Sequence, residues 1–180
     1  LEDTAPSDAT RAFERLGDEF HDYNEARVSS ISELERVFEG TTAPEWKALR
    51  VRSVLTFVFE SFYAYEFESL KRKNTDQAKR FLSRVPYLSL FPRSYALNLA
   101  LGTHLVPLDE SMRDAGIWLG LDSKGHSPQR AGNLLRPGIR KDDVEKFCGL
   151  LRCLAYDQRV HAEIEVPADA VSDDFSLDTM

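Results

Sequence analysis

The stretch from Val85 to Asp109 reads VPYLSLFPRSYALNLALGTHLVPLD, and it decides the fold. It begins with a tight connection at Val85-Pro86 and continues as a nearly all-apolar segment from Pro92 to Leu101, which Gly102 closes. Proline in the first turn and glycine just after the last are the usual boundaries of a helix. Because this helix has no polar face, we expect it to be buried on all sides.

A short loop, His104 to Leu108, follows this helix and leads to one acid, Asp109. Aspartate is a good N-cap, and the pattern after it predicts a helix to about Leu121. The residues alone therefore favour a capping role for Asp109, with a catalytic carboxylate as the alternative.

The rest of the chain also carries helical patterns, and no alternating strand pattern competes with them, so we predict an all-α fold. Residues 1–7 are expected to be disordered. In the helix that Pro44 begins, we expect Trp46 to face inward. The other expected helices run from Ser7 or Asp8 to about Tyr23, from Ser30 or Ser32 to Gly40, from Asn74 or Thr75 to Arg84, from Ser127-Pro128 to about Pro137-Gly138, and onward from Lys141 or Asp142.

The central stretch resembles the helix-hairpin-helix DNA glycosylase superfamily, of which endonuclease III is the familiar member. In that family a hairpin close to L-P-G-V-G-x-K-T-A is followed by a buried helix ending in A-L-G and by a loop that carries an aspartate. Counting back without a gap from Ala100-Leu101-Gly102 places Val85-Pro86 on L-P and Asp109 on the aspartate. The resemblance extends from about residue 7 to about residue 156 and implies two helical lobes around a central hairpin.

The resemblance assigns roles to residues of this chain. Asp109 would be the catalytic carboxylate, a role compatible with capping because the family's aspartate also begins a helix. Phe91 stands where many members carry a lysine that attacks the sugar, so we expect no lyase activity. Thr4 or its neighbours stand where the family inserts a glutamine into DNA. The expected DNA contacts are Arg84, Pro86, Tyr87, Leu88, Ser89 and Arg93, although side chains at Tyr87 and Ser89 replace two glycines of the phosphate-binding hairpin.

No cofactor or metal is expected. The family's iron–sulfur cluster needs four cysteines, whereas this chain has two, Cys148 and Cys153, which we interpret as reduced thiols of a cytoplasmic protein. No apolar run is long enough to cross a membrane. We expect one domain over residues 1–164, with helical sequence missing upstream, an acidic disordered tail over residues 165–180, and a monomer.

The formal net charge of −7 argues at first against a nucleic-acid partner. The charge is unevenly distributed, however, because residues 165–180 hold five acids and no base. Lys71 to Arg93 has seven bases against one acid, and Lys124 to Lys141 has five bases and no acid. These two basic segments could form a DNA-facing side, or they could be ordinary solvated helix faces.

Two functions remain open. The first is a base-excision-repair protein that binds damaged DNA, with or without glycosylase turnover through Asp109 alone. The second is a catalytically inactive member whose altered cleft binds a protein partner or another ligand. The basic segments and Asp109 favour the first, and the loss of the hairpin glycines and of the lysine favours the second. An unrelated helical regulator is a weaker third interpretation, because the gap-free register argues against it.

Overall fold

A computed structural model describes residues 1–65, 68–122 and 124–157 of the chain. These residues form helices, turns and loops, and no strand occurs among them. The predicted tail, residues 165–180, lies outside the described residues. None of the described helices combines the length and the apolar character that crossing a bilayer requires.

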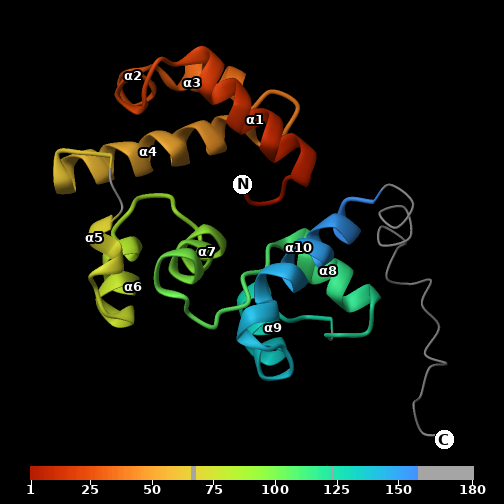
Figure 1. The fold of residues 1–180 in the computed structure, drawn as a ribbon. Coiled ribbons are helices and arrows are strands. Elements are labelled where there is room, and N and C mark those ends of the chain that lie inside the picture. The colour runs from red at the N-terminus through yellow and green to blue at the C-terminus, as the bar shows by residue number, and fades with distance from the viewer. Residues whose placement is uncertain (66–67, 123, 158–180) are drawn as a thin grey trace, which may run out of the picture.

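Four helices form the upper part of the molecule in Figure 1: α1 (Pro6–Glu19), α2 (Tyr23–Val28), α3 (Ile31–Val37) and α4 (Pro44–Phe62). The first three pack around the long α4, directly or through one another. The turns are set locally, since Ser30 and Glu33 form a reciprocal capping box at the start of α3. The small core of this part consists of Ala12, Ala26, Leu34, Val37, Phe38 and Ala48.

The middle part contains α5 (Glu68–Lys71), α6 (Thr75–Ser83) and α7 (Leu90–Leu101). Asn74 and Gln77 form a second capping box at the start of α6. Both α5 and α6 pack on α7, around Leu82 and Leu97. Phe81 of α6 joins this part to α4 through an edge contact with Phe57, with ring centroids 5.0 Å apart.

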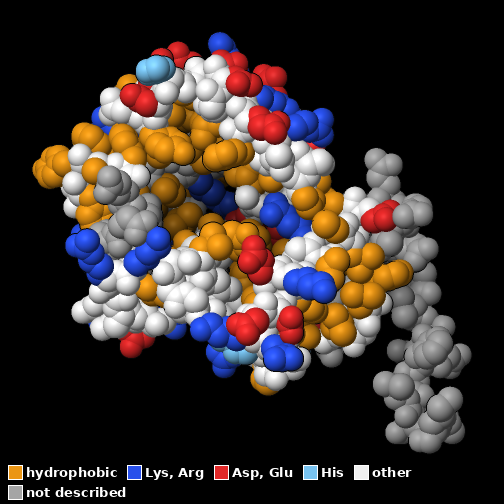
Figure 2. Space-filling view, in the orientation of Figure 1, with side chains coloured by type: hydrophobic (Ala, Val, Ile, Leu, Met, Phe, Trp, Pro, Cys, Tyr) orange, Lys and Arg blue, Asp and Glu red, His pale blue; other side chains and the backbone are white. Residues whose placement is uncertain are grey.

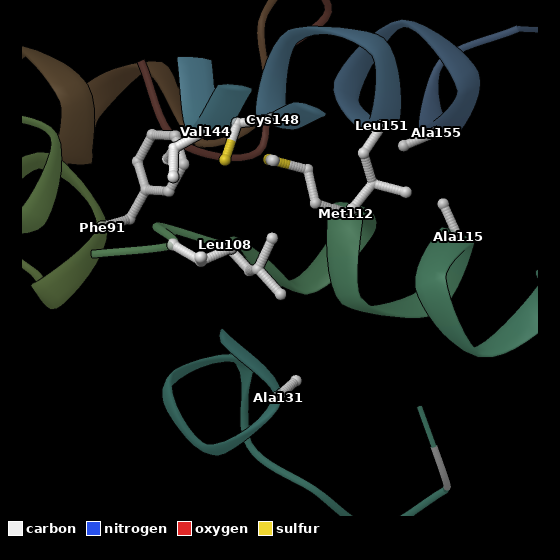
Figure 3. Close-up of a cluster of buried hydrophobic side chains, with 10 residues drawn as sticks. Phe91, Leu108, Met112, Ala115, Ala131, Val144, Cys148, Leu151 and Ala155 are labelled. Carbon is white, nitrogen blue, oxygen red and sulfur yellow. The ribbon is translucent and has the colours of Figure 1, made fainter. Parts of the chain in front are cut away.

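The remaining part contains α8 (Glu110–Trp118), α9 (Pro128–Leu135), two short 3₁₀ helices, Arg136–Gly138 and Lys141–Asp143, and α10 (Val144–Ala155). Its core lies between α8 and α10, with α9 below them. Figure 3 shows Phe91 reaching into this core from α7, with its ring toward Val144 of α10. Helix α7, which precedes the loop to Asp109, therefore contributes side chains to two cores: Leu97 to the middle part and Phe91 to this one.

Two expectations about burial are wrong. Helix α7 is not buried on all sides, because Tyr95 is 41% exposed and Leu99 is 65% exposed. On α4, Trp46 is 54% exposed and its neighbour Lys47 is buried. An apolar face is buried only where another element covers it, and the periodicity of one helix does not reveal which faces have partners.

The N-terminal segment also differs from expectation. Residues 1–5, which precede α1, were expected to be disordered, but they lie between α4 and the lower helices (Figure 1). Thr4 is 3% exposed, and Arg152 of α10 donates two hydrogen bonds to its carbonyl oxygen, at 2.7 and 3.1 Å. The segment is held by contacts with residues far along the chain, which local composition does not show.

Candidate functional site

A turn joins α6 to α7 at the predicted place. Helix α6 ends at Ser83, with Arg84 as its C-cap, and α7 begins at Leu90 with Ser89 as its N-cap. Val85 is buried at the base of the turn, and Leu88 is half-buried. Pro86 is exposed. The hairpin register counted from Gly102 therefore falls on two helices and the short connection between them.

Tyr87 keeps the backbone shape of a glycine at the hairpin. Its φ angle is 59°, in the left-handed region that residues with a side chain rarely adopt. Its ring is 56% exposed and lies against Trp46 of α4, with centroids 6.1 Å apart and the planes tilted by 59°. The ring of Tyr87 therefore stands on the surface.

The Ser89 side chain is hydrogen-bonded to an acid from the N-terminal segment. Its hydroxyl donates to the Glu2 carboxylate at 2.6 Å, and Arg50 of α4 forms a salt bridge with the same oxygen at 2.7 Å. Ser89 makes no side-chain capping bond to α7. Glu2 thus links the hairpin to α4 at the place where the resemblance expects a phosphate.

Asp109 is buried, and each of its carboxylate oxygens accepts a hydrogen bond. It is the N-cap of α8, and its Oδ1 accepts from the Met112 amide at 2.9 Å. Its Oδ2 accepts from the Asp3 amide at 3.0 Å, and the residue is 1% exposed. Asp3 brings a second carboxylate to the same place, and burial, with the nearby charges of Asp109 and Glu2, raises its pKa. The capping role is thus present, and the N-terminal segment covers the carboxylate.

Phe91 lies in the core and not at the surface. It is 8% exposed, and it stacks on Tyr95 with centroids 6.4 Å apart and planes 21° apart. Phe91, which the resemblance aligns with the family's lysine, is therefore a packed ring of the core.

A groove of about 760 Å³ lies beside the hairpin. Apolar side chains such as Leu82, Leu97 and Val106 line it, together with Ser89. Three bases also line it: Lys79 and Arg93 from the first basic segment, and Arg136 from the second. The groove therefore brings the two basic segments together, although Glu2 and Glu110 add negative charge to it. Arg84 is exposed at the end of α6, outside this lining.

Several other polar residues have structural contacts. His104 makes a 2.8 Å hydrogen bond between its Nε2 and the Ile139 carbonyl oxygen. Cys148 is buried, which raises the pKa of its thiol to about 12, and Cys153 is exposed. Within the described residues, no three His, Cys, Asp or Glu side chains gather in a way that could hold a metal ion.

Sequence reasoning missed the residues that surround Asp109 and the hairpin. Glu2, Asp3, Arg50 and Arg152 meet there from the N-terminal segment, α4 and α10. Their contacts with one another and with the hairpin span dozens of residues along the chain, so no local pattern marks them. The only signal was the resemblance, which placed the neighbourhood of Thr4 near the DNA.

Comparison with known proteins identifies the architecture. No protein-family model matches the chain, and no curated protein matches it. A solved structure of a trapped endonuclease III–DNA covalent intermediate, an estranged-adenine complex, is similar to it, with a TM-score of 0.62 and 14% sequence identity. The fold is endonuclease III-like. The match covers 83% of this chain and 66% of that chain, so this chain spans just under two thirds of its neighbour. The predicted all-α, endonuclease III-like fold is confirmed.

Proposed function

We propose that this protein binds DNA through the hairpin and the basic groove beside it, and that it belongs to base-excision repair as a binder of damaged DNA. The groove carries the proposal, because it joins Lys79, Arg93 and Arg136, which are far apart in the sequence, next to Ser89. Lysine and arginine neutralise backbone phosphates and provide most of the sequence-independent affinity for DNA. The similar solved structure is itself a DNA complex, which supports the same choice.

The shape of the groove favours a damaged site over a continuous duplex. A volume of about 760 Å³ is within the range of pockets that hold small ligands, roughly 300–1,000 Å³. Apolar walls with a few Lys and Arg side chains suit a nucleotide that is turned out of the base stack. Turning a nucleotide out is easiest where its base pair is already damaged. Figure 2 shows the molecule hollowed between α4 and the lower helices, with apolar side chains around the hollow and Lys or Arg side chains inside it, whereas no residue of α4 lines the groove itself.

The test is fluorescence anisotropy with duplexes that contain one abasic-site analogue or none, measured over a range of salt concentrations. We expect tighter binding to the abasic duplex, and affinity that falls as salt rises. Lys79→Gln with Arg136→Gln should weaken binding and lower the salt slope by about one for each lost phosphate contact. Arg36→Gln, at an exposed position on α3, is the matched control. Absence of binding at low salt would refute the proposal.

A second candidate is a catalytically inactive member of the fold, and Asp109 favours it. Both oxygens of this carboxylate already accept hydrogen bonds, and the residue is 1% exposed. Glycosylase turnover would require the N-terminal segment to leave Asp109. A glycosylase assay of the wild type and Asp109→Asn tests whether any turnover survives. Turnover that the variant abolishes while it stays folded would establish catalysis, and a borohydride-trapped complex with abasic DNA would contradict the predicted loss of lyase activity.

A further inference from the structure

Two aromatic rings from different parts of the chain meet at the surface beside the hairpin. Trp46 lies in the first turn of α4, and Tyr87 lies in the turn between α6 and α7. Their centroids are 6.1 Å apart, yet Trp46 is 54% exposed and Tyr87 is 56% exposed. Aromatic pairs that serve packing alone usually bury most of their area. This pair joins two elements and still offers more than half of its surface to a ligand.

The backbone on both sides of the pair is held in unusual conformations. Tyr87 has a φ of 59°, and Ala43, the N-cap of α4, has a φ of 50°. A side chain in this region has a steric cost that glycine lacks. Conformations of this kind are concentrated at binding sites, where the surrounding structure maintains them. At Tyr87 the strained conformation holds the ring out at the surface of the turn.

The charges around the pair are balanced. A cavity of about 280 Å³ next to Trp46 is lined by Lys47 and Arg50, and by the acids Glu2 and Asp3. Burial lowers the pKa of Lys47, and its ammonium group donates to the Thr42 carbonyl oxygen. The two acids offset the two basic residues here, whereas the groove beside Ser89 has three basic residues against two acids, Glu2 and Glu110. The aromatic pair therefore suits an uncharged planar group. Such a group would belong to a ligand whose phosphates bind in the neighbouring groove.

We propose that Trp46 and Tyr87 form a stacking site for one unpaired base of a DNA strand bound in the adjacent basic groove. This inference rests on the DNA binding proposed above. Every nucleobase has a flat face, so aromatic stacking accepts any base and depends little on sequence. Because the local charges cancel, the contribution of this site to affinity should change little with salt, in contrast to that of Lys79 and Arg136.

The first experiment follows the fluorescence of Trp46. The chain has two tryptophans, Trp46 and Trp118, so Trp118→Phe leaves Trp46 as the only one. We expect its emission to be quenched by a duplex with a short single-stranded gap, and not by an uninterrupted duplex of the same length. If the emission of Trp46 does not change when the protein is saturated with the gapped duplex, the stacking site is refuted.

The second experiment measures affinity for the gapped duplex by anisotropy. Trp46→Ala and Tyr87→Gly should each weaken binding roughly tenfold, by a factor that is the same at low and high salt. Glycine suits the backbone of residue 87, so that variant should stay folded, which circular dichroism will check. Phe13→Ala is the control, because Phe13 is 70% exposed on α1.

The outcomes separate this inference from the proposed function. If Trp46→Ala and Tyr87→Gly bind gapped DNA like Phe13→Ala, while Lys79→Gln with Arg136→Gln still weakens binding, the stacking site is refuted and the DNA groove is retained. If the wild type binds no DNA at low salt, both proposals fail. Loss of affinity for the gapped duplex alone, together with Trp46 quenching, supports the stacking site.

Discussion

Tyr87 has a backbone conformation that its side chain disfavours, with φ at 59°. The Cβ atom costs roughly 1–2 kcal/mol in this region. Tyr87→Gly and Tyr87→Ala both remove the ring, but only the first removes this cost. We expect the glycine variant to have a free energy of unfolding about 1 kcal/mol higher than the alanine variant, measured by urea denaturation.

Tyr95 provides the control for that comparison. It is 41% exposed inside α7, where the backbone is helical. Here the Tyr95→Ala variant should have a free energy of unfolding about 1 kcal/mol higher than the Tyr95→Gly variant, because glycine is destabilising in a helix interior. The same order of stability at both positions would contradict the role assigned to the backbone of Tyr87.

Asp3 should make the stability of the protein depend on pH. Burial, and then the charges of Asp109 and Glu2, raise its pKa in the folded state. A raised folded-state pKa means that the fold prefers the protonated carboxyl. The stability gained from this preference is complete below the unfolded pKa and is lost as pH rises through the folded pKa.

Asp3→Asn should therefore raise the free energy of unfolding at neutral pH, and its advantage over the wild type should shrink in acid. The amide oxygen can still accept the Ser111 backbone hydrogen bond that Asp3 receives. Thermal unfolding at pH values from about 4 to 7 measures the difference, a window chosen around the ordinary carboxyl pKa. An advantage that grows in acid would show that the sign is wrong.

At the residue scale, the sequence predicted roles that depend on near neighbours. Asp109 was predicted as an N-cap, and it bonds the amide three residues later. Trp46 was misplaced, because neighbouring positions on a helix point only about 100° apart and the long α4 has partners on more than one side. Glu2 and Asp3 were missed because their partners lie far along the chain.

Helix α9 lies unusually close to the loop that leads to Asp109. A Cβ atom added to Gly132 of α9 would be 2.2 Å from the Val106 carbonyl oxygen. Backbone cannot move as easily as a side chain, so Gly132→Ala should push α9 and the loop apart. We expect the free energy of unfolding to fall by about 1–3 kcal/mol, the usual cost of overpacking.

Gly149 is the matched control for Gly132. It lies in α10, is exposed, and has no atom within 4 Å of an added Cβ. Gly149→Ala should raise the free energy of unfolding by up to about 1 kcal/mol, because alanine is the better helix former. Denaturation of both variants gives the comparison. If Gly132→Ala is as stable as Gly149→Ala, then α9 and the loop are not in the close contact described.

At the scale of elements, helix starts were the most predictable feature. Side-chain caps at Asn74, Asp109 and Ser127 mark three starts, and Pro44 marks a fourth. The short helices α2 and α5 were not predicted, because six or four residues show too little of the helical period. The exposure of one side of α7 depends on the positions of other elements, which its own apolar pattern does not contain.

Across the whole molecule, the register counted through the hairpin was enough to predict the architecture. It works because the count depends on a turn, a helix and an N-cap at fixed spacing, and these elements set the path of the backbone. The meeting of the two basic segments at one groove was only one of two interpretations of the sequence, since net charge per segment does not say where each helix face points.

The net negative charge of the chain should weaken its binding to DNA through long-range repulsion. Residues 165–180 carry five acids and no base, so they account for −5 of the formal charge of −7. Negative charge anywhere on the chain opposes the approach of DNA, and salt screens this repulsion beyond about 10 Å at 0.1 M. Removing these residues should raise the affinity for duplex DNA several-fold at low salt, with an advantage that disappears at high salt.

A matched variant separates charge from length in this prediction. Replacing the five acids, Glu165, Asp169, Asp173, Asp174 and Asp178, by their amides keeps the length and removes the charge. Anisotropy titrations at low and high salt should give the amide variant the same gain as the deletion, and melting temperatures will verify that both keep the fold. A gain in the deletion alone, or one that persists at high salt, would mean that the segment acts by contact and not through its field.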